Sequence, residues 1–322
     1  MLAGFTAYSQ TIIPGKPVRI ACSGDTSQQY LLYFPAGCQP SDTIPLLLFL
    51  DPAARADVPV TLYSKLADSL HIAIAASCNS KNFDAASSID AVPAILADAE
   101  QRILRKENAV FLSGFSGGSR MAAALASAMP EIKGVIGCGA AFAPDALPGI
   151  TNFPFVPREI PYAGIAGVRD MNFEEMHSAC QLLQQRGKAN LLLYFDGGHQ
   201  WPAVAAMAAA VAWLLQQQGI STKMPVSYAN DLLALATNFN SSGHTAYTNA
   251  YLQQLSSIIS LEIMPGMFNK DIQGPQQQLL AQRFAGVLDD ERNTMDRISL
   301  LFSGLMNSTE IDNWNEQAWQ DE

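Results

Sequence analysis

The chain has 322 residues, of which 49% are hydrophobic and 15% charged, a balance that supports a packed core and argues against disorder. Its formal net charge of −10 and isoelectric point near 4.8 exclude the basic footprint that nucleic acids and anionic membranes require. No stretch reaches the roughly 20 uninterrupted apolar residues of a membrane span, so we expect no spanning helix.

The first ten residues, MLAGFTAYSQ, are mostly apolar and end near a small-x-small triplet, Ala7-Tyr8-Ser9, of the kind that signal peptidases cleave after. They contain no basic region, and the apolar part is shorter than a complete signal. We interpret residues 1–9 as the remnant of a secretory signal, which predicts a secreted or periplasmic bacterial protein. A frayed N-terminus is the alternative.

Between residues 10 and 222, apolar runs of strand length alternate with segments of helical periodicity. The five apolar residues LLLFL before Asp51-Pro52 are typical of a strand buried on both faces of a parallel sheet. In chain order we predict strands at 18–20, 30–34, 45–50, 71–77, 109–114, 133–142, 161–168 and 189–195. We predict helices at 60–70, 84–105, 118–129, 172–187 and 202–219.

This alternation predicts an α/β domain with a mostly parallel sheet between two layers of helices. The composition changes near Met224-Pro225, and from there to the end we find helical periodicity and no strong strand pattern. We therefore predict an α/β domain over 10–222 and a smaller all-helical domain over 225–322. The second domain is a candidate surface for self-association or for docking a partner.

Five cysteines leave at least one thiol unpaired within a monomer. Cys22 and Cys38 flank the first predicted hairpin, so a disulfide between them stays open if the compartment is oxidising. No cysteine pair has metal-ligand spacing, and the four histidines are scattered, so we expect no metal and no cofactor.

The pentapeptide Gly114-Phe115-Ser116-Gly117-Gly118 matches the G-x-S-x-G pattern of a nucleophile elbow. The match alone is weak, but an apolar run precedes it and a run of good helix formers follows it. The motif needs this setting because its serine lies on a sharp, strained turn between a strand and a helix. The helix N-terminus also directs N–H groups at the reacting centre. We predict that Ser116 is a nucleophile.

A serine hydroxyl is a poor nucleophile at neutral pH, so it needs a base that is held in place by an acid. His199 follows a predicted strand and a glycine-rich turn, on a loop from which an imidazole can reach the serine, and we predict it as the base. Asp170 ends the preceding predicted strand, and we predict it as the acid. Asp145 is the alternative acid. His177 and His244 are less favoured candidates for the base.

The oxyanion formed by nucleophilic attack needs two preorganised N–H donors. Gly117, directly after the serine, is predicted to supply one. The second is expected from the loop after the strand at 45–50. Because Pro52 has no N–H, we predict Ala53 as that donor.

Other side chains near the predicted strand ends are candidates for substrate binding. Trp201 either walls the substrate pocket or packs the start of the last helix. Asn79, with the polar residues Ser80, Lys81 and Asn82 behind it, either lines the pocket or forms an ordinary loop. Arg120 either meets an anionic substrate group or forms an ion pair on its helix, and we favour the ion pair.

The segments GFSGGSR, AGVRDMNFEEM and FDGGHQWP together resemble the branch of the α/β hydrolases that contains dienelactone hydrolases, feruloyl esterases and polyhydroxybutyrate depolymerases. The resemblance covers about residues 16–220 and is greatest to secreted bacterial members with a helical extension. It implies an eight-stranded α/β-hydrolase sheet and a triad of Ser116, Asp170 and His199. Relatives often have His or a glycine-rich sequence where this chain has Asp51-Pro52-Ala53-Ala54-Arg55.

These patterns predict an enzyme that hydrolyses a small-molecule or carbohydrate-linked carboxylic ester through an acyl-enzyme. A serine peptidase on the same triad is the second hypothesis. The third is a catalytically silent hydrolase fold that acts as a binding module. Fold alone does not name a substrate, so its identity is left open.

Overall fold

The computed structural model of the chain describes residues 11–39, 41–142, 160–220 and 228. Several sequence predictions lie outside these residues: the signal remnant at 1–9, the alternative acid Asp145 and His244. The helical domain predicted over 225–322 also lies outside them, apart from the single position 228.

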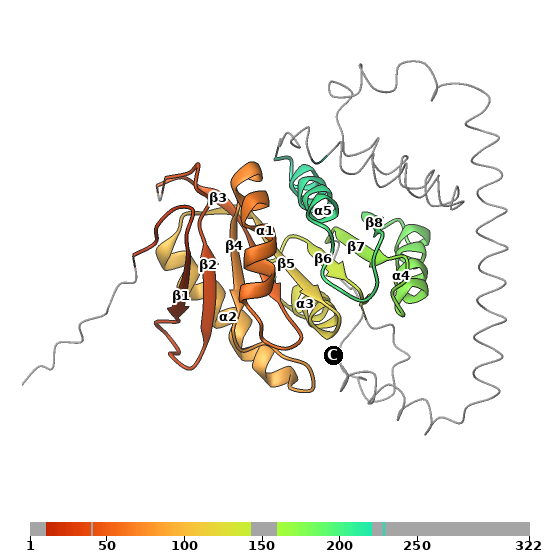
Figure 1. Cartoon of the computed structure of the whole chain (residues 1–322), viewed down its shortest axis with the longest axis horizontal. Helices are drawn as coiled ribbons and strands as arrows, with labels where there is room; N and C mark the ends of the chain where they lie inside the picture. The colour runs from red at the N-terminus through yellow and green to blue at the C-terminus, as the bar shows by residue number, and fades with distance from the viewer. Residues whose placement is uncertain (1–10, 40, 143–159, 221–227, 229–322) are drawn as a thin grey trace, which may run out of the picture. The chain divides into compact units, whose positions relative to one another are not determined.

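The described part of the chain contains one sheet of eight strands in the order β1-β2-β4-β3-β5-β6-β7-β8 (Figure 1). β1 runs antiparallel to β2, and β2 runs antiparallel to β4, whereas every other neighbouring pair is parallel. The strands are β1 (Pro17–Ala21), β2 (Gln29–Tyr33), β3 (Ile44–Leu50), β4 (Ala73–Ser77), β5 (Arg105–Phe115), β6 (Val135–Cys138), β7 (Tyr162–Gly167) and β8 (Asn190–Phe195).

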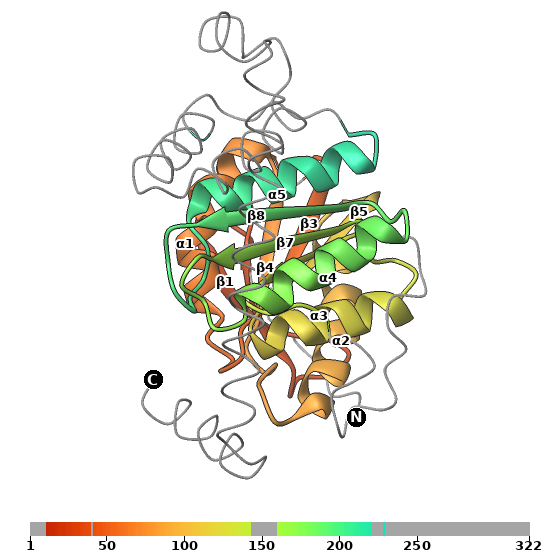
Figure 2. The same ribbon diagram turned by 90° about the vertical axis from the view of Figure 1, so that its right-hand side faces the viewer.

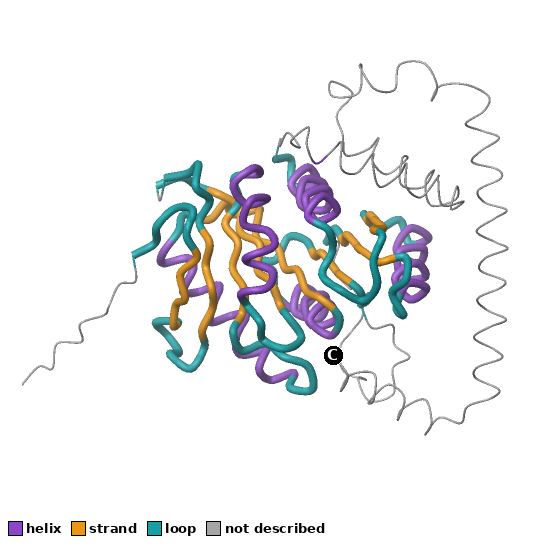
Figure 3. Tube along the Cα trace, viewed as in Figure 1, coloured by secondary structure: helices purple, strands orange, loops and turns teal. Residues whose placement is uncertain are grey.

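Five helices cover the sheet among the described residues and make it the middle of three layers (Figures 2 and 3). The helices α1 (Asp57–Leu70) and α5 (Val204–Gln217) pack together on one face. The other face carries α2 (Ala85–Arg102), α3 (Gly117–Ala128) and α4 (Phe173–Gln185). The predicted α/β fold class, with a mostly parallel eight-stranded sheet in three layers, is confirmed. None of the described helices is long and apolar enough to cross a membrane.

The core follows from the apolar runs of the central strands. All seven residues of β3 are buried, as are all residues of β4, β6 and β7. A strand covered by helices on both faces has no solvent side, so its sequence shows no alternation. Parallel strands also bring their carboxyl ends to one edge of the sheet, which is where β5, β7 and β8 deliver the residues of the site described below.

Several predicted boundaries are wrong: the helix predicted over 60–70 begins at Asp57, the strand predicted over 133–142 is only Val135–Cys138, and the junction between α2 and β5 is misplaced. The helix predicted over 84–105 ends at Arg102, because Ile103 has extended dihedrals (φ −133°, ψ 144°). The next strand therefore begins at Arg105, where it pairs with Ile44 of β3, and not at residue 109. Ile103 is buried and fits the helical period, so the apolar pattern alone could not separate the end of the helix from the strand.

The disulfide left open between Cys22 and Cys38 is not formed, and both residues are buried free thiols. The hairpin pairs Ala21 with Gln29 and Pro17 with Tyr33. Cys22 therefore lies at the turn end of the hairpin, whereas Cys38 lies beyond its opposite end. Burial raises the pKa of the Cys22 thiol to about 11, so this group stays protonated at neutral pH.

A buried carboxylate ties α2 to the first hairpin. Asp98 is 2% exposed and accepts hydrogen bonds from Arg102 Nε (2.6 Å), Tyr30 Oη (2.8 Å) and the Ser23 N–H (2.8 Å). Burial by itself raises the pKa of Asp98, but the hydrogen bonds from Arg102, Ser23 and Tyr30 outweigh it and lower the net pKa. Folding therefore favours the charged carboxylate.

Asp98→Ala is expected to lower the free energy of unfolding by about 3 kcal/mol, because Arg102 is left partly buried without its counter-ion. Denaturant titration of both proteins measures the difference. Since the pKa of Asp98 is lowered in the folded state, this stabilisation is present above the ordinary carboxyl pKa and is lost as pH falls through the lowered value. A variant that is as stable as the wild type at neutral pH, or a difference in stability that persists in acid, contradicts this assignment.

Candidate active site

Ser116 lies at the sharp turn between β5 and α3, with dihedrals of φ 53° and ψ −122° that few residues other than glycine adopt. Its N–H donates to the carbonyl of Cys138 at the end of β6 (2.8 Å), which fixes the turn against the neighbouring strand. A Cβ added to Gly114 would lie 2.1 Å from the carbonyl oxygen of Gly118, so only glycine allows this close approach. The predicted elbow geometry is therefore present.

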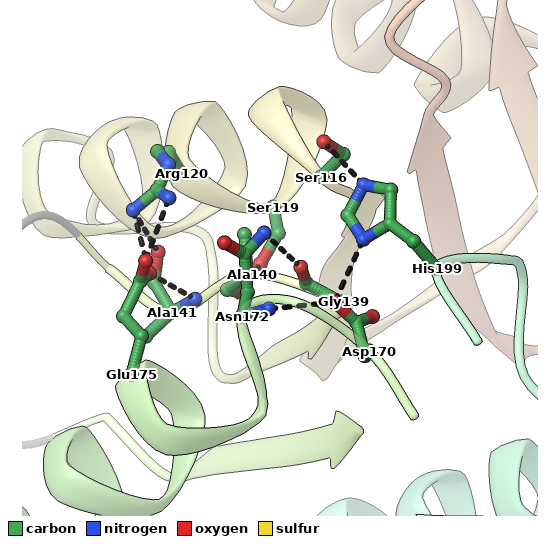
Figure 4. A network of polar contacts seen from close by, with 10 residues as sticks. All are labelled: Ser116, Ser119, Arg120, Gly139, Ala140, Ala141, Asp170, Asn172, Glu175 and His199. Atoms are coloured by element: carbon green, nitrogen blue, oxygen red, sulfur yellow. Dashed lines mark hydrogen bonds and ion pairs between the residues drawn. The ribbon is translucent and has the colours of Figure 1, made fainter. Parts of the chain in front are cut away.

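The three predicted triad residues meet at the carboxyl edge of the sheet (Figure 4). His199 Nε2 lies 3.0 Å from Ser116 Oγ, and His199 Nδ1 lies 2.9 Å from Asp170 Oδ1. The side chains of Asp170 and His199 are 0% and 6% exposed. With the proton on Nδ1 donated to the carboxylate, Nε2 is an acceptor for the Ser116 hydroxyl, which is the arrangement that general-base activation requires.

Asp170 is held by the turn that follows β7. Its N–H donates to the carbonyl of Gly167 (3.0 Å), and its Oδ1 accepts the N–H of Asn172 (2.8 Å) in addition to the imidazole. The Asn172 side chain in turn donates to the carbonyl of Gly139 (2.8 Å), after β6 (Figure 4). The second oxygen, Oδ2, is buried and has no hydrogen-bond partner among the residues that the structure describes. The hydrogen bonds that the described residues donate to this carboxylate therefore all go to the oxygen that faces His199.

The loop that carries His199 is fixed at both ends. Before the histidine, the carbonyl of Gly197 accepts the N–H of Arg169 (2.9 Å), and Asp196 forms an ion pair with the Arg169 side chain. After it, Trp201 Nε1 donates to Asp51 Oδ2 (2.9 Å). The ring of Phe115, the residue before the serine, lies 4.7 Å from the imidazole ring. These contacts hold the imidazole between serine and carboxylate.

The ion-pair interpretation of Arg120 is supported by its geometry. Its guanidinium donates to both carboxylate oxygens of Glu175, at 2.6 Å and 2.8 Å, and so joins α3 to α4 (Figure 4). Glu175 Oε1 also accepts the N–H of Ala141 (2.9 Å). A bidentate pair of this kind satisfies the guanidinium, which leaves Arg120 as part of the scaffold behind the elbow.

The structure does not support Trp201 as the wall of a substrate pocket. It is 8% exposed and packs against the rings of Phe49, Tyr63 and Phe115, with centroid distances of 5.5–6.1 Å. Its indole N–H donates a hydrogen bond to the fully buried carboxylate of Asp51. The same carboxylate also accepts hydrogen bonds from the backbone N–H groups of Ala53 and Arg55. Trp201 thus follows the packing alternative, and Asp51 links the base loop to the loop after β3.

The contacts of Asn79 favour the ordinary-loop alternative over substrate binding. Its Oδ1 accepts the N–H of Gln29 (2.8 Å) and its Nδ2 donates to the carbonyl of Ser27 (3.0 Å), so both ends of the amide support the first hairpin. The residue of this loop that reaches the elbow is Asn82. A Cβ added to Gly117 would lie 1.9 Å from Asn82 Oδ1, so Asn82 occupies the place of a side chain at position 117.

The two predicted oxyanion donors differ in availability. Gly117 is the first residue of α3, so its N–H has no carbonyl partner within the helix. The N–H of Ala53, in contrast, donates to Asp51 Oδ1 at 2.9 Å. No group of three or more His, Cys, Asp or Glu side chains within the described ranges is arranged to hold a metal ion.

No protein-family model and no curated protein sequence matches the chain. An esterase from Pyrobaculum calidifontis has 13% identity and a TM-score of 0.45, over 63% of this chain and 80% of its own. An S-formylglutathione hydrolase from Staphylococcus aureus has 11% identity and a TM-score of 0.47, over 62% and 95%. A ferulic acid esterase has 14% identity and a TM-score of 0.46, over 63% and 98%. At such identities and TM-scores, these likenesses carry no argument about what the chain does.

Proposed function

We propose that this chain is a serine hydrolase that cleaves carboxylic esters through an acyl-enzyme intermediate. The observation that carries the proposal is the continuous hydrogen-bond chain from Ser116 Oγ through His199 to Asp170, with contacts of 3.0 Å and 2.9 Å. A nucleophile in contact with a base, and a base in contact with an orienting carboxylate, are the parts that acyl transfer needs.

In the proposed reaction, Ser116 Oγ attacks the ester carbonyl carbon while its proton passes to His199 Nε2. The carbonyl electron pair moves to oxygen and forms a tetrahedral oxyanion, beside the N–H of Gly117. The oxyanion then collapses, the bond to the alcohol oxygen breaks, and His199 protonates the departing alcohol. Water attacks the acyl-enzyme in the same way, gives a proton to His199, and releases the acid and the serine hydroxyl.

An ester is our preferred substrate over a peptide because the three segments around the triad resemble the esterase branch named above. The preferred class is a small-molecule or carbohydrate-linked ester. A serine peptidase uses the same triad and stays the second candidate. A silent binding module is less well supported, because a fold that has lost catalysis has no need to keep all three side chains in hydrogen-bond contact.

The first test is covalent labelling with a fluorophosphonate, which reacts with an activated serine. We expect stoichiometric labelling of the wild-type protein and none of Ser116→Ala. Ser113→Ala, a buried serine of β5 close to the elbow, is the matched control and should still be labelled. Absence of wild-type labelling, or labelling that survives Ser116→Ala, overturns both the esterase and the peptidase hypotheses. Panels of nitrophenyl esters and peptides then separate these two.

Two further proposals concern segments outside the described residues. A secreted or periplasmic location rests on the composition of residues 1–9, and N-terminal sequencing of the native protein that finds these residues retained overturns it. A role of residues 225–322 in self-association or partner docking rests on their helical periodicity. Sedimentation of the full chain tests the self-association part directly.

A further inference from the structure

The N–H that the sequence predicts as the second oxyanion donor, that of Ala53, already has a hydrogen-bond partner. The carboxylate of Asp51 is fully buried and accepts the N–H of Ala53, the N–H of Arg55 and the indole N–H of Trp201. Moving the Ala53 N–H to a substrate oxygen breaks a charge-assisted bond inside this cluster, which costs free energy at each turnover. Preorganised donors avoid such a cost, so a different group is better placed for the role.

Asn82 contacts both the loop after β3, at Pro52, and the elbow, at Gly117. Its N–H donates to the carbonyl of Pro52 (2.7 Å), and Lys81 pairs with Ala53 in an isolated antiparallel bridge. The loops after β3 and β4 are therefore joined to each other. This junction fixes the backbone from which the Asn82 side chain extends to Gly117.

The side-chain amide of Asn82 is positioned beside the first N–H of α3. A Cβ on Gly117 would lie 1.9 Å from its Oδ1, 2.7 Å from its Cγ and 3.0 Å from its Nδ2. The glycine at position 117 makes room for the amide, since any side chain there would displace it. Among the described residues no hydrogen bond engages this amide, unlike that of Asn79.

We infer that Asn82 Nδ2 is the second donor to the oxyanion, together with the N–H of Gly117. This inference rests on the proposed function. The two ends of a carboxamide have the same shape, and a half-turn about χ2 exchanges oxygen and nitrogen. Negative charge developing beside Gly117 favours the rotamer that points the NH₂ group at it. The helix N-terminus and the amide then stabilise the same atom from two sides.

The test compares Asn82→Ala and Asn82→Asp with the wild type, with p-nitrophenyl acetate as substrate. Both variants should lose about 10²- to 10³-fold in kcat with KM nearly unchanged, as for removal of one oxyanion donor. Aspartate keeps the size of asparagine but replaces the donor by an acceptor, so it separates donation from packing. The inhibition constant of an alkyl trifluoromethyl ketone, which forms the tetrahedral oxyanion, should rise by a similar factor.

Asn79→Ala is the matched control, because it removes the amide of the same loop that supports the hairpin. It should lower the melting temperature and leave kcat within about twofold. The final extent of fluorophosphonate labelling should reach one per chain in both Asn82 variants, because the nucleophile is intact. Retention of kcat within about threefold by Asn82→Asp, or unfolding of both variants, means that the amide only packs, and overturns the inference. A wild type that is neither labelled nor active overturns the proposed function itself.

Discussion

His199→Ala is expected to lower kcat for ester hydrolysis by about 10⁴-fold or more, with little change in the free energy of unfolding. Among the described residues, His199 is the only one whose side chain forms a hydrogen bond with the Ser116 hydroxyl. Without it, the proton released during attack has no acceptor. Residual activity then comes from the oxyanion donors and from binding. Steady-state kinetics with a nitrophenyl ester, together with denaturant titration, measures both quantities.

His177→Ala is the matched control for this substitution. His177 lies on α4, where its ring nitrogens contact Tyr194 Oη and Gln181 Nε2, both at 2.9 Å, away from the serine. Its loss should affect stability and leave kcat within about twofold. A drop of less than tenfold for His199→Ala means that another group is the base.

Asp170→Asn is expected to lower kcat by about 10⁴-fold. Asparagine that turns its NH₂ group to His199 forces the proton onto Nε2, which is the wrong tautomer for accepting the serine proton. Asparagine that turns its oxygen to His199 keeps the tautomer but buries its NH₂ group at the Oδ2 position, where no described residue forms a hydrogen bond with the native oxygen. In both orientations the negative charge that stabilises the imidazolium is lost. Initial rates over a range of pH measure the effect.

The matched control is Asp196→Asn, which removes the carboxylate of an exposed ion pair on the base loop. Exposed pairs contribute little, so kcat should stay within about twofold. Asp145→Asn tests the alternative assignment of the acid. If that change is the damaging one and Asp170→Asn is mild, the acid follows the strand before β7.

The sheet and the triad were predictable because their signals are local. LLLFL and AVFL are uninterrupted apolar runs of strand length, and such runs in series with helices predict a parallel sheet. Parallel strands deliver their carboxyl ends to one edge, so a serine, an aspartate and a histidine that each follow a strand were expected to meet. The contacts of His199 with Ser116 and Asp170 are those that this argument requires.

The surroundings of the triad were not predictable, because they depend on contacts between residues far apart in the chain. Trp201 donates to Asp51 across 150 positions, and Asn79 reaches back to Ser27. The polar sequence Asn-Ser-Lys-Asn does not show that the amide of Asn79 forms hydrogen bonds with the first hairpin whereas that of Asn82 lies at the elbow. The glycine at 117 was a usable signal for Asn82, since a position that excludes every side chain indicates that another group is close.

The attachment of the base loop through Gly197 and Trp201 has a thermodynamic consequence. A histidine that is held by the packed interior gives up its conformational freedom once, when the chain folds, and not at every encounter with a substrate. Because of the same attachment, we expect that the loop does not unfold separately from the rest of the domain. Activity and tertiary structure should therefore disappear in a single cooperative transition on heating, so the thermal limit of the catalyst is that of the whole domain.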